Sequence, residues 1–235
     1  MTVGSLFSGI GGFDLGLERA GMKVRWQVEN DPYCNRVLRK HWPDVVRYGD
    51  IKLIDWHAVE RVDLVCGGFP CQPVSVAGKR KGRDDERWLW PEFARCLGVL
   101  RPCYVLIENV SGLLVRGFAD VLRDLAACGY DAEWDNLPAG AFGAHQLRYR
   151  IYVIASRSGT HCLRRGREWA NRVRTHEWTE FERLVQYELS VCVPAGKSQR
   201  ISDGLSHRVD RLRGLGNAVV PQVVEWIGQR ILVNA

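Results

Sequence analysis

The chain has 235 residues, of which 46% are hydrophobic, and its formal net charge is +6 at pH 7. This length and apolar content predict one globular domain with at most a small second lobe, and they exclude a disordered chain. No apolar run approaches the roughly 18 residues of a membrane span, and the first residues, MTVGSLFSGIGG, do not form a signal peptide. We therefore expect a soluble, intracellular and monomeric protein.

Short apolar runs alternate with amphipathic stretches from Thr2 to Ser156, which is the pattern of strands and crossover helices in an α/β sheet. Strands are predicted at Thr2–Phe7, Lys23–Val28, Asp63–Gly67, Tyr104–Glu108 and Arg150–Ser156, with one more ending near Asp50. Helices are predicted at Phe13–Ala20, Pro32–Lys40, Pro91–Leu100 and Val115–Cys128. We expect a doubly wound, Rossmann-like sheet over residues 1–156, with a ligand crevice at the carboxyl ends of its strands.

The periodicity weakens between Arg157 and Arg213, where twelve basic residues stand against seven acidic ones. Thr179–Leu189 is the one convincing helix there, and we interpret residues 157–213 as a small irregular lobe. A polyanion is a natural partner for this charge, although a solvated helical face explains it equally well. Residues 214–235 return to an apolar helix, Pro221–Leu232, which we expect to pack back on the sheet.

The eight cysteines are scattered along the chain, several of them inside apolar runs, and no two are spaced as CxxC. In a chain of this size such scattered cysteines favour reduced thiols over a disulfide framework. No zinc or other metal site is predicted from this spacing.

A glycine-rich turn, Ser8–Gly12, lies between the first strand and the first helix, where the backbone can approach a ligand. This turn indicates a nucleotide-type cofactor. Asp14 stands where the dinucleotide fingerprint needs its third glycine, so NAD is not supported. Glu29 ends the second strand, where an acid can accept both ribose hydroxyls, and Asp50 can accept from an adenine amino group. On spacing alone, both acids also fit ordinary surface positions.

The segment Gly67–Gly78 follows a buried strand, and its Pro and Gly content predicts a loop at the carboxyl edge of the sheet. Cys71 would then lie beside the cofactor turn. A single cysteine is more often a packing residue than a nucleophile. However, the next strand ends in Glu108-Asn109-Val110, which brings a carboxylate to the same edge. Two reactive groups and a cofactor turn thus converge from separate parts of the sequence.

The chain resembles the bacterial and phage cytosine-5 DNA methyltransferases, because five motifs of that family stand in the same order. They are Phe7–Gly12, Pro70–Gln72, Glu108–Val110, Gln146–Arg150 and Gly216–Pro221. The match covers most of the chain outside residues 157–214. It implies a Rossmann-like catalytic domain, S-adenosylmethionine as the methyl donor, double-stranded DNA as the partner, and a place in the bacterial cytoplasm.

The resemblance also implies roles for single residues. Cys71 would add to C6 of a flipped-out cytosine, Glu108 would protonate N3, and Arg150 and Arg148 would hold the base oxygen and a nearby phosphate. Strand-edge salt bridges are the simpler interpretation of the two arginines. The implied cofactor contacts are Phe7, Gly9, Ile10, Gly11, Glu29, Asn30, Asp50, Ile51, Pro70, Asn217 and Val219. The expected DNA contacts are Gln72, Ser75, Lys79, Arg80 and Lys81 near the nucleophile, and Arg164, Arg165, Arg167, Arg172 and Arg174 in the lobe.

The chain departs from the family pattern in three places. Ser5 replaces an acid that commonly opens the first motif, Ala218 replaces a Ser or Thr, and the arginine-rich stretch before the last motif is reduced to Arg208–Arg213. Two other functions stay open, an RNA cytosine methyltransferase and a non-catalytic DNA-binding homologue. The sequence lacks the Cys-Phe-Thr signature of the RNA-modifying branch. A decayed enzyme has no physical need for Cys71 together with Glu108.

Overall fold

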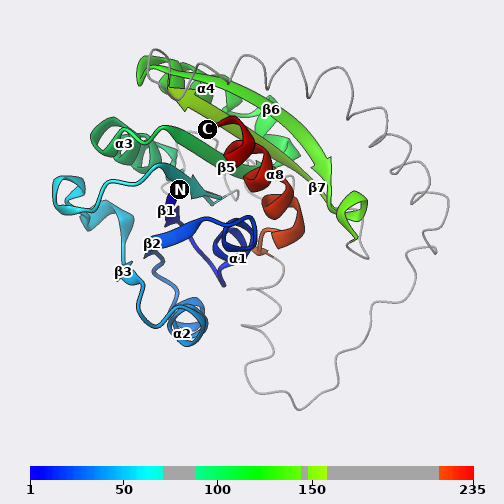
Figure 1. Cartoon of the computed structure of the whole chain (residues 1–235). Helices are drawn as coiled ribbons and strands as arrows, with labels where there is room; N and C mark the ends of the chain where they lie inside the picture. Colours follow the sequence, from blue (N-terminus) through cyan, green and yellow to red (C-terminus); the bar gives the residue numbers. More distant parts are fainter. Residues whose placement is uncertain (71–87, 144–147, 158–216) are drawn as a thin grey trace.

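Seven strands form one sheet in the order β3-β2-β1-β4-β5-β7-β6 (Figure 1). The computed structural model describes residues 1–70, 88–143, 148–157 and 217–235. The strands are β1 (Thr2–Leu6), β2 (Lys23–Val28), β3 (Val46–Tyr48), β4 (Leu64–Gly67), β5 (Tyr104–Val110), β6 (Tyr130–Pro138) and β7 (Tyr149–Arg157). The predicted α/β fold is confirmed, and the second strand has the bounds expected from sequence.

The first five strands are parallel, whereas β7 runs antiparallel to both β5 and β6. The pairing puts Leu6 opposite both Val28 and Gly67, and Gly67 opposite Ile107. The carboxyl ends of β2, β1 and β4 are therefore level, and β5 continues beyond them to Val110. The strand order reverses between β1 and β4, which is where open α/β sheets bind ligands.

Helices cover both faces of the sheet (Figure 1). The α-helices in the described ranges are α1 (Gly12–Arg19), α2 (Pro32–His41), α3 (Trp90–Leu100), α4 (Phe118–Ala127) and α8 (Pro221–Asn234). Helices α1 and α8 lie side by side on one face, while α3 and α4 pack on the other. A side chain at Gly16 of α1 would come 2.6 Å from the Cβ of Val224, so glycine permits this close helix packing.

Local sequence explains where the helices begin. The Asp31 carboxylate accepts hydrogen bonds from the backbone N–H groups of Tyr33 and Cys34, and Pro32 occupies the first turn of α2. Pro91 has the same first-turn place in α3. Within the described ranges, short 3-10 helices connect the main elements: η1 (Ile51–Leu53), η2 (Trp56–Ala58), η4 (Ser111–Val115) and η5 (Ala139–Phe142).

Two sequence predictions need correction. The helix expected over Val115–Cys128 is divided, because Gly117 adopts φ +108 and only Phe118–Ala127 is α-helical. A side chain at Gly117 would also come 2.8 Å from the Trp88 ring. The edge strand β6 was not predicted, because its middle residues are exposed or half-buried and lack a clear apolar alternation. The predicted helix Thr179–Leu189 lies outside the described residues.

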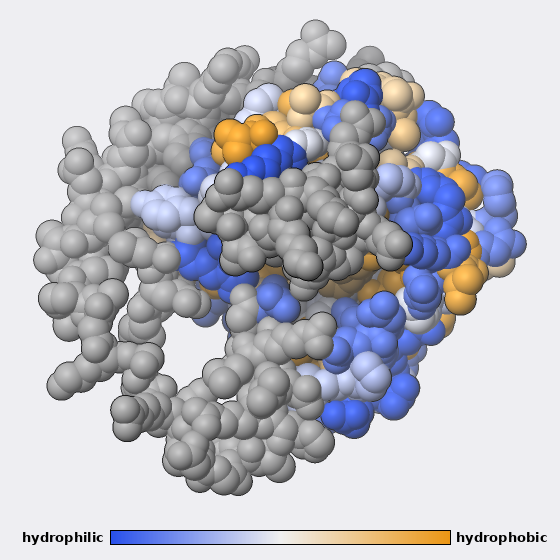
Figure 2. Space-filling view, turned by 180° about the vertical axis from the view of Figure 1, so that it is seen from behind, coloured by the Kyte–Doolittle hydropathy of each residue, from blue (hydrophilic) through white to orange (hydrophobic). Residues whose placement is uncertain are grey.

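The described surface is mixed in character. Figure 2 shows small hydrophobic patches among hydrophilic residues on one face of the molecule. The most exposed large apolar side chains, Leu53, Val115 and Val233, belong to three separate elements, which is usual for protein surfaces. Among the helices that the structure describes, none is long and apolar enough to cross a membrane. The described cysteines with free thiols are Cys34, Cys66, Cys96, Cys103 and Cys128.

Candidate active site

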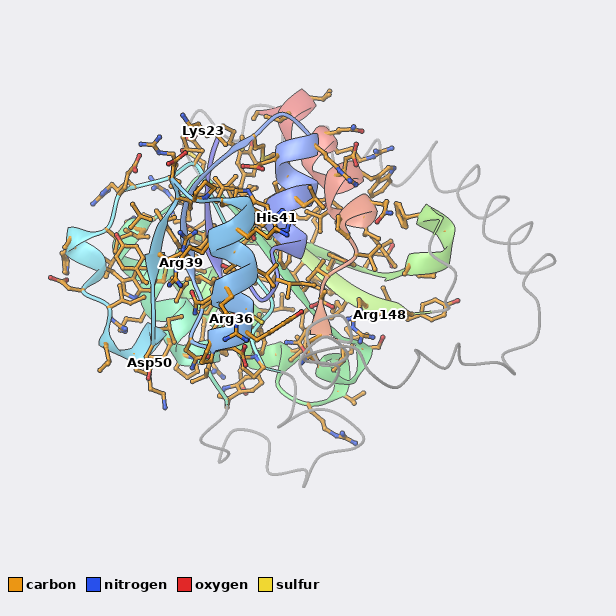
Figure 3. All side chains as sticks on the ribbon, turned by 90° about the horizontal axis from the view of Figure 1, so that it is seen from below. Lys23, Arg36, Arg39, His41, Asp50 and Arg148 are labelled. Carbon is orange, nitrogen blue, oxygen red and sulfur yellow. The ribbon has the colours of Figure 1, made fainter. Side chains whose placement is uncertain are left out.

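A cavity of about 320 Å³ lies where the carboxyl ends of β1, β2, β4 and β5 meet. Its wall includes residues that end or follow these four strands and β3, the first turns of α1 and α2, and residues 217–219 ahead of α8. Leu89, Arg148 and Arg150 complete it. The cavity has the size of a small-molecule site. In Figure 3, Asp50 and Arg148, which both line it, lie at opposite ends of one edge of the molecule.

The glycine turn forms one part of this wall. Phe7 and Gly9 both have positive φ, +51 and +56, and for Phe7 this backbone conformation is strained. The Glu29 carboxylate fixes the turn by accepting from the Gly9 N–H at 2.7 Å and from the Asp31 N–H at 2.7 Å. A carboxylate has about four acceptor positions, so Glu29 can still accept hydrogen bonds from a ligand.

The far side of the cavity, next to β3, carries Asp50 and the first turn of α2. The Asp50 carboxylate caps η1 by accepting from the Lys52 N–H at 3.0 Å, and its side chain is exposed. Tyr33 also lines the wall, and the Arg36 guanidinium lies over its ring, 5.6 Å from the centroid. An aromatic ring and an acid at one end of a cavity suit a flat nitrogen heterocycle.

Glu108 lies at the opposite end, on β5, and only 7% of it is exposed. Burial raises the pKa of this carboxyl to about 7, against the opposing effects of Arg150 and then Arg148. A side chain at Gly68 would come 2.9 Å from Glu108 Oε2. Glycine at that position therefore leaves room for the carboxyl. The site thus holds an acid that is partly protonated at neutral pH.

The two arginines of the Gln146–Arg150 motif make different contacts. Arg150 pairs with Glu108, with its Nε 3.1 Å from Oε1. This pairing follows from the β5–β7 ladder, in which Val110 faces Arg150 and Glu108 faces Tyr152. Arg148 instead donates from Nη1 to the Ala218 carbonyl oxygen at 2.7 Å. The arginines are thus not equivalent, although sequence alone gave them a shared role.

Asn109 connects β5 to the residues that follow the neighbouring strand β4. Its Nδ2 donates to the Phe69 carbonyl oxygen at 3.1 Å, and its Oδ1 accepts from the Val110 N–H at 2.9 Å. Asn109 is 2% exposed. Phe69 and Pro70 immediately precede Cys71 in the sequence, so this bond fixes the backbone just ahead of that cysteine.

Most of the expected cofactor residues that the structure describes lie together on the cavity wall. They are Phe7, Gly9, Glu29, Asn30, Asp50, Ile51, Pro70, Asn217 and Val219, joined by Glu108, Arg148 and Arg150. Ile10 and Gly11 do not line it, and a side chain at Gly11 would meet the Trp42 ring at 2.4 Å. Cys71, Gln72, Ser75, Lys79, Arg80, Lys81 and the five arginines of the lobe lie outside the described residues.

Sequence reasoning did not assign every wall residue to the site, and Tyr33, Cys34 and Leu89 are examples of those it missed. The signal for the first two was the Asp31-Pro32 helix start, which places the following residues at the same edge as Glu29. Leu89 directly precedes α3 and has no recognisable motif.

Ser5 has a partner that sequence reasoning did not anticipate. Its hydroxyl donates to Asp14 Oδ2 at 3.0 Å, and Gln27 Nε2 donates to Asp14 Oδ1 at 2.8 Å. Neither Ser5 nor Asp14 lines the cavity, and both are fully buried. Burial raises the pKa of Asp14 to about 6, opposed by the bonds to Gln27 and Ser5. Ser5 thus binds a carboxyl group of α1 that does not reach the cavity.

The strand order, the reversed β7 and the glycine turn over an edge cavity define a Rossmann-like methyltransferase fold. Two solved structures share it. A prophage-encoded protein of E. coli, assigned as a DNA modification methyltransferase, superposes with a TM-score of 0.57 at 27% identity, covering 67% of this chain and 47% of that one. The S. pombe Dnmt2 methyltransferase superposes with a TM-score of 0.58 at 25% identity, covering 68% of this chain and 52% of that one.

The chain belongs to the C-5 cytosine-specific DNA methylases, whose family pattern matches residues 1–207. It is 39% identical over 153 residues to the type II methyltransferase M.NgoMIV of Neisseria gonorrhoeae, covering 63% of this chain and 49% of that protein. It is 36% identical over 177 residues to M.AquIA of Picosynechococcus, covering 66% and 71%. The chain thus spans about half the length of M.NgoMIV.

Proposed function

We propose that this chain transfers a methyl group from S-adenosylmethionine to C5 of a cytosine in double-stranded DNA, in the bacterial cytoplasm. One observation carries the proposal. A single cavity holds a Glu29-braced glycine turn at one end and the Glu108–Arg150 pair at the other, with Pro70, the residue before Cys71, on its wall. A cofactor and a target base would thus meet beside a cysteine.

The residues of the cavity fit S-adenosylmethionine. Glu29 retains acceptor positions for ribose hydroxyls, Asp50 offers an acceptor for an adenine amino group, and Tyr33 offers a ring face. The N-terminal end of α1 at Gly12 favours a carboxylate. When bound, this cofactor supplies an electrophilic methyl group on a sulfonium.

The chain's own residues would activate the base. The Cys71 thiolate adds to C6, the electron pair of the C5–C6 bond moves toward C5, and Glu108 gives its proton to N3. C5, made electron-rich by these two steps, would then be the nucleophile toward the methyl group that the bound cofactor supplies. Loss of the C5 proton to solvent expels the thiolate, restores the double bond and returns the N3 proton to Glu108. Arg150 orients Glu108 throughout, through the contact of 3.1 Å.

The direct test is a methyl-transfer assay with tritiated S-adenosylmethionine and equal amounts of duplex DNA and RNA. We expect label at C5 of cytosine in DNA alone. Label in RNA alone would establish the RNA-modifying alternative. No transfer despite measurable DNA binding would establish the non-catalytic alternative.

The covalent step has a separate test. DNA carrying 5-fluorocytosine should trap a denaturant-resistant adduct, because fluorine cannot leave C5 as a proton does. Cys71→Ser should abolish both the adduct and methylation without unfolding the protein, since the two side chains are almost the same size. An enzyme that methylates normal DNA yet never traps the fluorinated base would contradict the role of Cys71.

A further inference from the structure

Arg148 contacts the C-terminal segment across 70 positions of sequence. Its Nη1 lies 2.7 Å from the carbonyl oxygen of Ala218, and the contact is partly buried. The backbone of Arg148 is itself anchored, because its carbonyl oxygen accepts from the Ala139 N–H at 2.9 Å at the start of η5. The guanidinium thus reaches from a fixed point on the sheet to a segment ahead of α8.

Ala218, which accepts the hydrogen bond from Arg148, belongs to the cavity wall together with its two neighbours. Asn217, Ala218 and Val219 all line the cavity. The opposite side of this segment rests on the first turn of α1, since a side chain at Gly12 would come 2.5 Å from the Val219 carbonyl oxygen. The wall segment 217–219 is therefore held between α1 and Arg148.

Arg148 and Arg150 differ in what they bridge. Arg150 joins β7 to Glu108 on the adjacent strand. Arg148, just ahead of β7, instead contacts wall segment 217–219 and lies well apart from Asp50 (Figure 3). A guanidinium presents several donors in a rigid plane, which suits it to hold a carbonyl oxygen at fixed distance.

We propose that Arg148 is a positioning residue for cofactor binding, which holds wall segment 217–219 against the Glu108 edge through the Ala218 carbonyl oxygen. This inference rests on the proposed function in naming S-adenosylmethionine as the ligand. It assigns Arg148 a task within the protein in place of a phosphate of the substrate.

The first experiment measures S-adenosylmethionine binding by calorimetry without DNA, in the wild type and in Arg148→Met and Arg150→Met. We expect Arg148→Met to raise Kd by about ten- to a hundredfold, the size of one hydrogen bond from a charged donor. Arg150→Met should bind the cofactor within about twofold of wild type and lose methyl transfer. Arg148→Lys, which keeps one donor, should recover part of the affinity. Arg25→Met removes an exposed arginine that pairs with Glu60 and serves as the surface control.

The second experiment is independent of any ligand. Hydrogen exchange of the peptide covering residues 217–224 should be faster in Arg148→Met than in wild type, while Arg150→Met and Arg25→Met leave it unchanged. This readout also separates the two proposals. Should wild-type protein fail to bind S-adenosylmethionine, the proposed function is wrong, but faster exchange still supports the anchoring role.

Two results would overturn the inference. The first is that hydrogen exchange of residues 217–224 is as slow in Arg148→Met as in the wild type, whatever the cofactor affinity of the variant. The second is that Arg148→Met binds DNA more weakly in the absence of cofactor, and with a smaller salt dependence, while its cofactor affinity is unchanged. That pattern marks a phosphate contact.

Discussion

At the scale of single residues, the proposed function depends on a carboxyl whose pKa lies near neutral pH because it is buried. Burial raises the pKa of Glu108 to about 7, and Arg150 holds it in place at 3.1 Å. The acid form is half populated near pH 7 and falls as pH rises. The task proposed for Glu108 needs that acid form, so the enzyme should lose this contribution on the alkaline side of about pH 7.

Glu108→Gln should slow methyl transfer by about two orders of magnitude or more, because glutamine cannot give a proton to N3. The part of the alkaline decline that belongs to Glu108 should also disappear. Single-turnover rates at saturating S-adenosylmethionine, taken across the pH range, measure both effects, and cofactor affinity serves as the control. Near-normal turnover of the variant would rule out the proton role.

Asp14 allows a prediction about stability. Its pKa is raised from 3.8 to about 6, so the folded state binds the proton more tightly than the unfolded state does. The free energy of unfolding should therefore fall as pH rises from about 4 to about 6 and stay level above. Asn at position 14 can accept from Gln27 and donate to Ser5, whose hydroxyl can rotate.

In Asp14→Asn this pH-dependent loss should vanish, so the variant should gain stability relative to wild type as pH rises to about 6. Urea denaturation at several pH values measures it. If the free energy of unfolding differs between wild type and Asp14→Asn by the same amount at every pH, the raised pKa of Asp14 is contradicted.

At the scale of elements, packing decides what the sequence pattern leaves open. The parallel strands were predictable, because β1, β4 and β5 are buried along almost their whole length, while β2 alternates polar and apolar residues. Edge strand β6 was not, since only its ends are buried. The convergence of Glu29, Asp50 and Glu108 was predictable from strand ends alone. The different tasks of Arg148 and Arg150 were not, because Ala218 lies 70 positions from its partner.

Gly12 tests the contact between α1 and the C-terminal segment. Gly12→Ala would place a methyl group 2.5 Å from the Val219 carbonyl oxygen, so that the cavity wall must shift. We expect weaker S-adenosylmethionine binding and also a lower midpoint of thermal unfolding, because the clash is with backbone atoms that have to move. Gly98→Ala in α3 is the matched control, because a side chain there meets nothing within 4 Å and should add up to about 1 kcal/mol of stability. Equal cofactor affinity in both variants would contradict the contact.

At the scale of the whole molecule, catalysis and sequence recognition should lie in different parts of the chain. If the cavity holds one base and a cofactor as proposed, flanking bases are left to residues 157–213 and the residues after Cys71. A lobe of this length should read a short target of roughly two to four base pairs, each good contact contributing about 1–3 kcal/mol of discrimination.

Arginine-to-alanine changes in the lobe should then divide into two groups. Phosphate contacts would weaken binding to every sequence and flatten its salt dependence, whereas base contacts would relax specificity at one position. The variants are Arg164→Ala, Arg165→Ala, Arg167→Ala, Arg172→Ala and Arg174→Ala, compared by mapping methylated cytosines. If all five retain wild-type affinity and methylation pattern, recognition resides elsewhere.

The wall segment 217–219 has a consequence for biosynthesis. Because this segment and Phe7 line the same cavity but lie far apart in the sequence, the ribosome makes these two parts of the wall at different times. A nascent chain lacking the later residues cannot form the complete cavity, even with β1 to β5 already paired. Chains arrested before residue 217 should therefore leave S-adenosylmethionine unbound, and chains extended past α8 should bind it. Methylation would then begin only after residues 217–219 have been synthesised and have packed against the rest of the cavity wall.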